Sequence, residues 1–220
     1  MRHLRPIVLA TLGVALCAAP VAGAHDRHGG RHGAVVTPAN GKLLGEGLAQ
    51  LYGLPLSENP WAGAGDPCVR VGRGVIVAVG GGPCTIKYGT ALMLGWSAAW
   101  SNAERPYPET EAEQLAEALA ADRPYTQITV TVDDDRPVDI LRRRFELVTR
   151  QRTVQLPEDN ILDGYDPEAP EVPAQTITFT AHGWMALVRN LRPGRHTIVL
   201  AAVYAGEPSS ASFDITVVRR

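Results

Sequence analysis

Two cysteines, Cys68 and Cys84, are the side chains of this chain whose spacing most clearly suggests chemistry. They flank a stretch rich in glycine and valine, PCVRVGRGVIVAVGGGPC. A redox dithiol needs C-x-x-C, and a structural zinc site needs four close ligands. A phosphate loop needs Lys-Ser or Lys-Thr after its last glycine, or GxGxxG opening a helix, whereas Gly82 precedes Pro83 and Cys84. In an exported chain such a pair predicts a disulfide, here within a stapled hairpin whose third strand begins with CTIKY.

Export is what the first residues predict. Residues 1–24, MRHLRPIVLATLGVALCAAPVAGA, join a basic start to an apolar run and end in a small-residue cleavage signature. The run is shorter than the ~20 apolar residues that span a membrane. We therefore expect a signal peptide cleaved after Ala24, a protein that is secreted or associated with the cell envelope, and no remaining transmembrane anchor. Abundant alanine and the near absence of lysine suggest a GC-rich bacterial genome.

Histidines are candidates for a base or a metal ligand. His182 precedes Gly183-Trp184, and His196 follows a Pro-Gly-Arg turn. A histidine at a strand end more often caps a turn through a ring nitrogen, and we favour that interpretation for both. Residues 25–40 begin with HDRHGGRHG and predict a disordered His/Gly-rich tail, in which no spacing fixes a metal site, so we expect no metal and no cofactor.

Acidic residues gather after YTQITVTVD and again in PEDNILDGYDPEAPEVP. Carboxylates in such clusters coordinate calcium, form the catalytic pair of a hydrolase, or support solvated turns. Neither GxSxG, HExxH nor a calcium loop occurs, so we favour turns and a mobile surface loop. The alternative, hydrolysis of an extracellular polymer, would draw its pair from Asp133, Asp135, Asp139, Glu146 and Asp163.

Tryptophans are the candidate ligand-binding residues, because flat aromatic faces stack on sugars and other rings. Trp96 and Trp100 are four residues apart and share a face in either a helix or a strand. Trp184 lies in the later strand WMALVRNL. Sandwich cores also use tryptophan, so core packing stays open beside a binding platform. Net charge is −2, which gives no reason to expect nucleic acid as a partner.

Two helices and many short strands must position these residues. Leu44, Leu48 and Leu51 predict a helix at about residues 41–52. TEAEQLAEALAADRP predicts a second one, with a Thr110/Glu113 capping box and an apolar face at Leu115, Ala116 and Leu119. Alternation with period two predicts strands in YTQITVTVD, FELVT, RTVQL, TITFT, WMALVRNL, HTIVLAAVYA and SFDITVV. The chain therefore predicts one antiparallel β-sandwich over residues 41–220, with one inserted amphipathic helix and a short N-terminal helix.

Two passages resemble a family of uncharacterised secreted bacterial β-rich proteins. CVRVGRGVIVAVGGGPCTIKYGTALMLGWSAAW is similar to its paired cysteines flanking a hydrophobic strand, and AHGWMALVRNLRPGRHTIVL to its later G-aromatic-strand-LxPGxHTI motif. This chain has Asp134-Asp135-Arg136 where the family usually has Asp-Gly. The resemblance implies a secreted β-rich domain with a Cys68–Cys84 bridge, and no catalytic residue.

The function that these observations favour is a non-enzymatic extracellular module that binds a ligand or partner, such as a cell-wall or other extracellular glycan. Export and the absence of a catalytic signature support this hypothesis, and its binding part rests on fold analogy. Hydrolysis of an extracellular polymer and a purely structural surface role are the alternatives.

Overall fold

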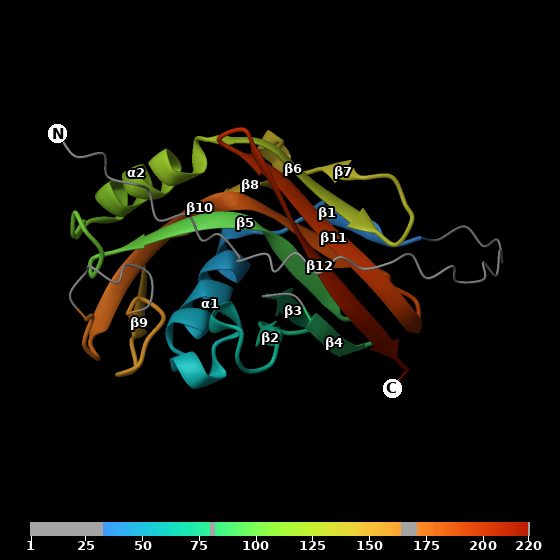
Figure 1. The fold of residues 1–220 in the computed structure, drawn as a ribbon, viewed down its shortest axis with the longest axis horizontal. Coiled ribbons are helices and arrows are strands. Elements are labelled where there is room, and N and C mark those ends of the chain that lie inside the picture. Colours follow the sequence, from blue (N-terminus) through green and yellow to red (C-terminus); the bar gives the residue numbers. More distant parts are fainter. Residues whose placement is uncertain (1–32, 80–81, 164–170, 220) are drawn as a thin grey trace.

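Two β-sheets packed face to face, with two α-helices, make up the fold (Figure 1). The computed structural model describes residues 33–79, 82–163 and 171–219. The prediction of a mainly-β sandwich with added helices is confirmed. The predicted signal peptide and residues 25–32 of the predicted tail lie outside the described residues.

The larger sheet contains seven strands: β1 (Val35–Pro38), β2 (Cys68–Val71), β3 (Val75–Ala78), β5 (Ala91–Ser101), β8 (Glu146–Val148), β9 (Arg152–Gln155) and β10 (Thr176–Arg189). Their order is β1-β10-β5-β3-β2, and β8 and β9 also pair with β10. The pairs are antiparallel except β3 with β5, which is parallel. The passages TITFT and WMALVRNL, predicted as separate strands, are both part of β10.

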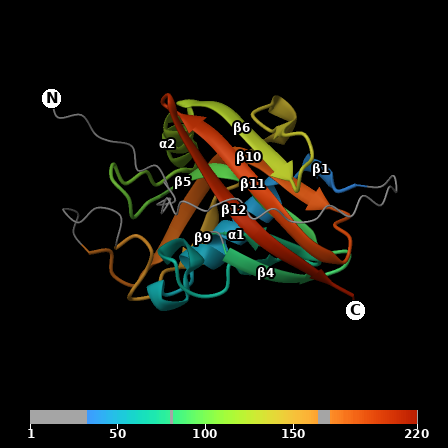
Figure 2. The ribbon, with the colours of Figure 1, turned by 45° about the vertical axis from the view of Figure 1, so that its right-hand side comes forward.

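The smaller sheet contains five strands: β4 (Gly82–Lys87), β6 (Tyr125–Val132), β7 (Val138–Asp139), β11 (Gly194–Tyr204) and β12 (Glu207–Val218). Their order is β4-β12-β11-β6-β7. The long β11–β12 pair crosses in front of β5 and β10 (Figure 2). Alternate residues of β6 and β12 fill the space between the sheets, as their period-two pattern predicts: Ile128, Val130, Val132, Phe213, Ile215 and Val217 are all buried.

The helices lie on opposite sides of β5 and β10 (Figure 1). Helix α1 (Gly41–Tyr52) begins at Asn40, whose side chain accepts the Leu43 N–H at 3.0 Å, and it buries its leucines against the larger sheet. Helix α2 (Glu111–Asp122) begins with the predicted Thr110/Glu113 capping box. Short 3-10 turns occupy Leu56–Glu58, Pro60–Ala62 and Arg143–Phe145.

The start of the domain corrects the predicted tail. Residues 33–40 were expected to be disordered, but Val35–Pro38 form β1 and pair with Ala186–Arg189 of β10. Val36 packs against the core between the sheets. Alternation over so few residues, next to a glycine- and histidine-rich stretch, is too short to predict a strand.

The predicted disulfide Cys68–Cys84 is present, but it does not staple one hairpin. β2 and β3 form the expected antiparallel hairpin, whereas β4 leaves that sheet and runs parallel to β12 in the other. The bridge therefore joins the edges of two sheets. Pairing between distant segments decides which sheet β4 enters, and local sequence carries no signal for it.

Helix α2 buries a different face from the one predicted. Leu119 is 41% exposed, whereas Gln114 and Ala118 are fully buried and Asp122 is 2% exposed. The Gln114 side chain donates to the Pro108 and Thr178 carbonyls and accepts from the Thr180 hydroxyl. Two buried polar side chains with protein partners therefore replace the expected leucine contacts.

Candidate functional site

β5 has a free edge beyond the end of β3. On the side away from β10, β3 pairs with β5 only from Ala91 to Met93. Alternate residues of β5 face this side, as the Ala91 N–H does, so beyond Met93 the backbone groups of Gly95 and Ser97 point toward it. Within the described part of the chain, no strand pairs with Leu94–Ser97 on this side.

A hollow of about 100 Å³ lies along this edge and is open to solvent. Its walls come from α1, from β3 and β10, and from β11 and β12 of the other sheet. Trp61, Met185, Ala211 and Phe213 are among the lining side chains, and none of the lining residues carries a charge. The hollow is an apolar groove beside an exposed length of strand backbone, and we call it the β5 groove.

Trp96 lines the β5 groove and is 8% exposed. Its indole Nε1 is buried and has no hydrogen-bond partner in the described structure. A buried donor without an acceptor is costly, because it has lost its hydrogen bonds to water.

Two glycines bring the backbones of β5 and β10 together at the groove. A Cβ atom on Gly95 would fall on the carbonyl of Trp184, and one on Gly183 would fall on the backbone of Trp96 and Ser97. Both positions therefore require glycine for packing.

The three predicted binding tryptophans do not form one exposed platform. Trp96 and Trp184 are directly opposite in the β5–β10 register, and Trp100 is opposite Thr180. Trp96 and Trp100 are buried, and Trp184 is half-buried. The expectation of an exposed stacking surface is therefore not met at Trp96 and Trp100, and the core-packing alternative describes both.

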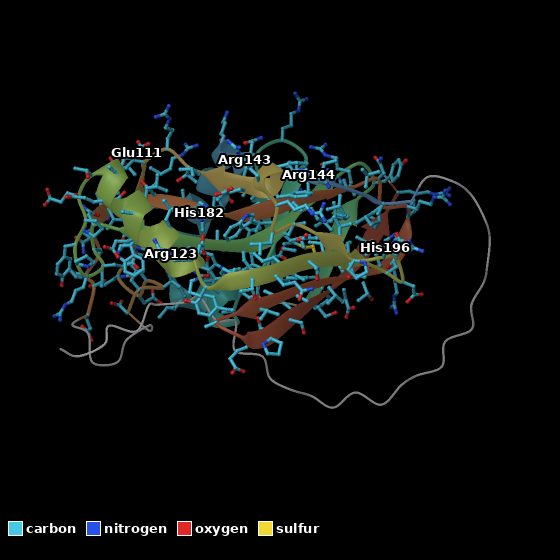
Figure 3. The ribbon with its side chains drawn as sticks, turned by 90° about the horizontal axis from the view of Figure 1, so that it is seen from above. Glu111, Arg123, Arg143, Arg144, His182 and His196 are labelled. Carbon is cyan, nitrogen blue, oxygen red and sulfur yellow. A yellow bond between two sulfur atoms is a disulfide. The ribbon has the colours of Figure 1, made fainter. Side chains whose placement is uncertain are left out.

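His182 is buried between two carboxylates where α2 meets the larger sheet (Figure 3). Its Nδ1 lies 2.7 Å from Asp122 Oδ2, and its Nε2 lies 3.2 Å from Glu146 Oε1. Ionised carboxylates only accept hydrogen bonds, so this geometry fits the doubly protonated imidazolium. His182 sits inside β10, so its interpretation as a turn cap at a strand end is wrong.

His182 and Asp122 each favour the charged form of the other. Burial opposes the charged form of His182, but the hydrogen bonds from its ring to Asp122 and Glu146 outweigh burial and raise the pKa of His182. Burial also raises the pKa of the Asp122 carboxyl, an effect that the His182 hydrogen bond and positive charge oppose. The Asp122 carboxylate thus binds the imidazolium and also accepts the Ala98 N–H of β5.

Aromatic rings connect this centre to the β5 groove. The His182 ring meets Trp184 edge-on at a centroid distance of 4.9 Å. Tyr125 contacts Trp184, Trp96 and Tyr204 at centroid distances of 6.2, 6.0 and 4.9 Å. Burial, with the Asp122 charge nearby, raises the pKa of Tyr125. The phenol therefore stays neutral and packs against the core between the sheets.

The remaining predicted candidates have separate local roles. His196 does cap a turn: its Nδ1 lies 2.8 Å from Asp133 Oδ2 and its Nε2 2.8 Å from the Arg192 carbonyl oxygen. Asp139 binds Arg142, and Asp163 accepts the Val172 N–H. Among the residues that the structure describes, no three histidine, cysteine or acidic side chains are grouped to hold a metal ion.

A second hollow, of about 340 Å³, lies on the outer face of the smaller sheet. Its lining consists of small or polar residues, namely Gln127, Thr129, Ala201, Ala202, Val203, Pro208, Ser209 and Ser210. It contains no aromatic ring on which a sugar could stack. It therefore offers less than the β5 groove to recognise a ligand.

Glu104, in the loop after β5, carries a testable pH dependence. Burial raises its pKa to about 7, although Ser101 donates to the carboxylate from its hydroxyl and its N–H. The folded protein thus holds the proton more tightly than the unfolded chain, so this group lowers stability as pH rises from about 4.5 to 7. We expect Glu104→Gln to stabilise the protein by about 1 kcal/mol at pH 8 and not at pH 4, measured by urea unfolding. Equal effects at both pH values would contradict this.

Comparisons with known proteins add little to this description. No family model matches the chain, and no curated protein matches it. The solution structure of Amebosin aligns with 63% of this chain and 88% of its own, at 10% identity and a TM-score of 0.21. A structure of PbICP-C in complex with falcipain-2 aligns with 64% of this chain and 91% of its own, at 11% identity and a TM-score of 0.22. At TM-scores this low, neither structure supports a statement about the fold or function of this chain.

Proposed function

We propose that this protein is a non-enzymatic binding module whose ligand occupies the β5 groove. The observation that carries the proposal is the combination of an apolar, uncharged hollow with a length of β5 that no described strand pairs on that side. Apolar lining with few polar groups is the usual composition of a binding site. The groove lies between rigid elements, because both sheets and α1 contribute to it.

The proposed setting is outside the cell, in the family that the two sequence passages resemble. A disulfide between the two sheets suits an oxidising compartment. In the described part of the chain, no helix is long and apolar enough to cross a membrane. The disulfide agrees with export, which the sequence of residues 1–24 predicts.

The histidine centre supports a binding role over hydrolysis. Asp122 and Glu146 are both bound to the imidazole of His182. A hydrolytic pair needs one carboxylate free to donate a proton and another free to attack or activate water. Here the charges hold α2 and β8 onto β10.

Filling the groove tests the proposal. Ala211 lies on β12 and lines the groove, so Ala211→Phe should place a ring where the ligand sits. We expect ligand affinity to fall at least tenfold while the protein remains folded. The ligands to be titrated are a fluorescein-labelled acetyl-KVTVTVK-amide peptide, decanoate, and insoluble bacterial cell wall by co-sedimentation.

The matched control is Ala201→Phe, the same change on the neighbouring strand β11 but in the outer hollow. Loss of binding in Ala211→Phe with retention in Ala201→Phe would support the β5 groove. The reverse pattern would place the site on the outer face. Binding of none of the three probes to the unaltered protein would also refute the proposal.

A further inference from the structure

We propose that the ligand of the β5 groove is an extended peptide strand, which adds to the larger sheet along the free edge of β5 at Leu94–Ser97. This inference rests on the proposed function and names its partner. In such strand addition, backbone hydrogen bonds provide affinity and side-chain pockets provide specificity.

The free edge supplies the backbone half of this recognition. β5 continues to Ser101, but β3 accompanies it only as far as Met93. Gly95, Ser97 and Ala98 are half-buried, so solvent reaches the backbone here. An extended peptide would lie beyond the end of β3 and continue the row of backbone hydrogen bonds that β3 makes with β5.

Most other strand edges of the fold carry features that discourage strand addition. Charged side chains and prolines are the usual protection of an exposed edge. They occur at Pro38 in β1, Arg70 in β2, Pro83 and Lys87 in β4, Asp139 in β7, Glu146 in β8, Arg152 in β9, and Glu207-Pro208 at the start of β12. Leu94–Ser97 carries neither a charge nor a proline, and it lies beside an apolar groove.

The size of the hollow also favours a peptide. At about 100 Å³ it is smaller than the roughly 300–1,000 Å³ of a typical small-molecule site. It has room for about one or two aliphatic side chains, while the backbone of the ligand lies outside it along the strand. Because no lining residue is charged, the inserted side chains should be uncharged.

Alternate residues of β5 present their backbone groups to opposite sides of the strand. The Ala91 N–H faces β3, so within Leu94–Ser97 the backbone groups of Gly95 and Ser97 face the free edge. Leu94–Ser97 spans about 13 Å in an extended conformation. The groove should therefore bind about four consecutive residues of the partner in register.

Alternate N-methylation of the peptide tests strand addition directly. Two derivatives of acetyl-KVTVTVK-amide would be made, one N-methylated at every valine of the peptide and the other at every threonine. Valine and threonine alternate in this peptide, so each derivative blocks the amides of one edge of the extended strand. Only one edge of an added strand faces β5, so we expect one derivative to lose at least tenfold in affinity and the other to bind as the parent does. Fluorescence anisotropy of labelled peptides measures this.

The outcomes separate the inference from the function on which it rests. Equal binding of both derivatives would overturn strand addition, as would binding of decanoate without any binding of the peptide. In either case the groove remains a binding site if Ala211→Phe abolishes the binding that is observed. If none of the probes binds, or if Ala211→Phe leaves their binding unchanged, both strand addition and the proposed binding function are wrong.

Discussion

Asp122→Ala is expected to lower the free energy of unfolding by about 3 to 5 kcal/mol, because it removes one partner of a buried charged pair. The side chains of Asp122 and His182 are 2% and 3% exposed, so water cannot replace the lost contact. Urea unfolding at pH 6 measures the change.

The chain contains a matched control on its surface. Asp133 binds the Nδ1 of His196 at 2.8 Å and accepts the Thr197 N–H, much as Asp122 binds His182 and accepts the Ala98 N–H. The Asp133 side chain is 46% exposed, so Asp133→Ala should cost about 1 kcal/mol or less. Equal costs for the two substitutions would contradict our account of the buried centre.

The same pair should make stability depend on pH. The pKa of His182 is raised in the folded protein, so its contribution is complete below the unfolded value near 6.5 and is lost as pH rises through the folded value. Unfolding curves of the unaltered protein should therefore shift to lower urea on the alkaline side. Asp122→Ala should flatten this part of the pH profile.

Removal of the disulfide is expected to cost about 3 kcal/mol in the chain-entropy model. Cys68 and Cys84 are 16 residues apart, and their bond holds β2 of one sheet to β4 of the other. The double variant Cys68→Ser/Cys84→Ser should therefore unfold at a lower urea concentration than the oxidised protein.

Reduced, unaltered protein serves as the control, because it lacks the bond but keeps both side chains. It should unfold close to the double variant and well below the oxidised form. Intact-mass analysis should show that alkylation of both cysteines requires prior reduction. Labelling of both thiols in unreduced, freshly exported protein would refute the disulfide.

Local periodicity predicts much of this fold. The strands β6, β11 and β12 occur where alternation indicates them, and α1 and α2 lie where the leucine spacing and the capping box predict them. These signals are contained in neighbouring residues, so they survive without knowledge of the tertiary structure.

The candidate site depends on contacts between distant segments, and the sequence does not reveal it. Asp122 looks like the solvated end of an amphipathic helix, and only the approach of β10 shows that it binds His182. The free edge of β5 arises because β3 stops at Ala78 and β4 crosses to the other sheet. The sequence leaves core packing and a binding platform open for Trp96, and only the tertiary structure shows that this residue is buried and lines a groove.

Amide hydrogen exchange of β5, measured with and without acetyl-KVTVTVK-amide, tests strand addition at this edge most directly. Our account predicts new protection at the amides of Gly95 and Ser97, which face the free edge, with little change at Leu94 and Trp96, which already pair with β10. Protection that appears instead at Ser209–Ser212 of β12, at β4 or at any other edge would contradict it.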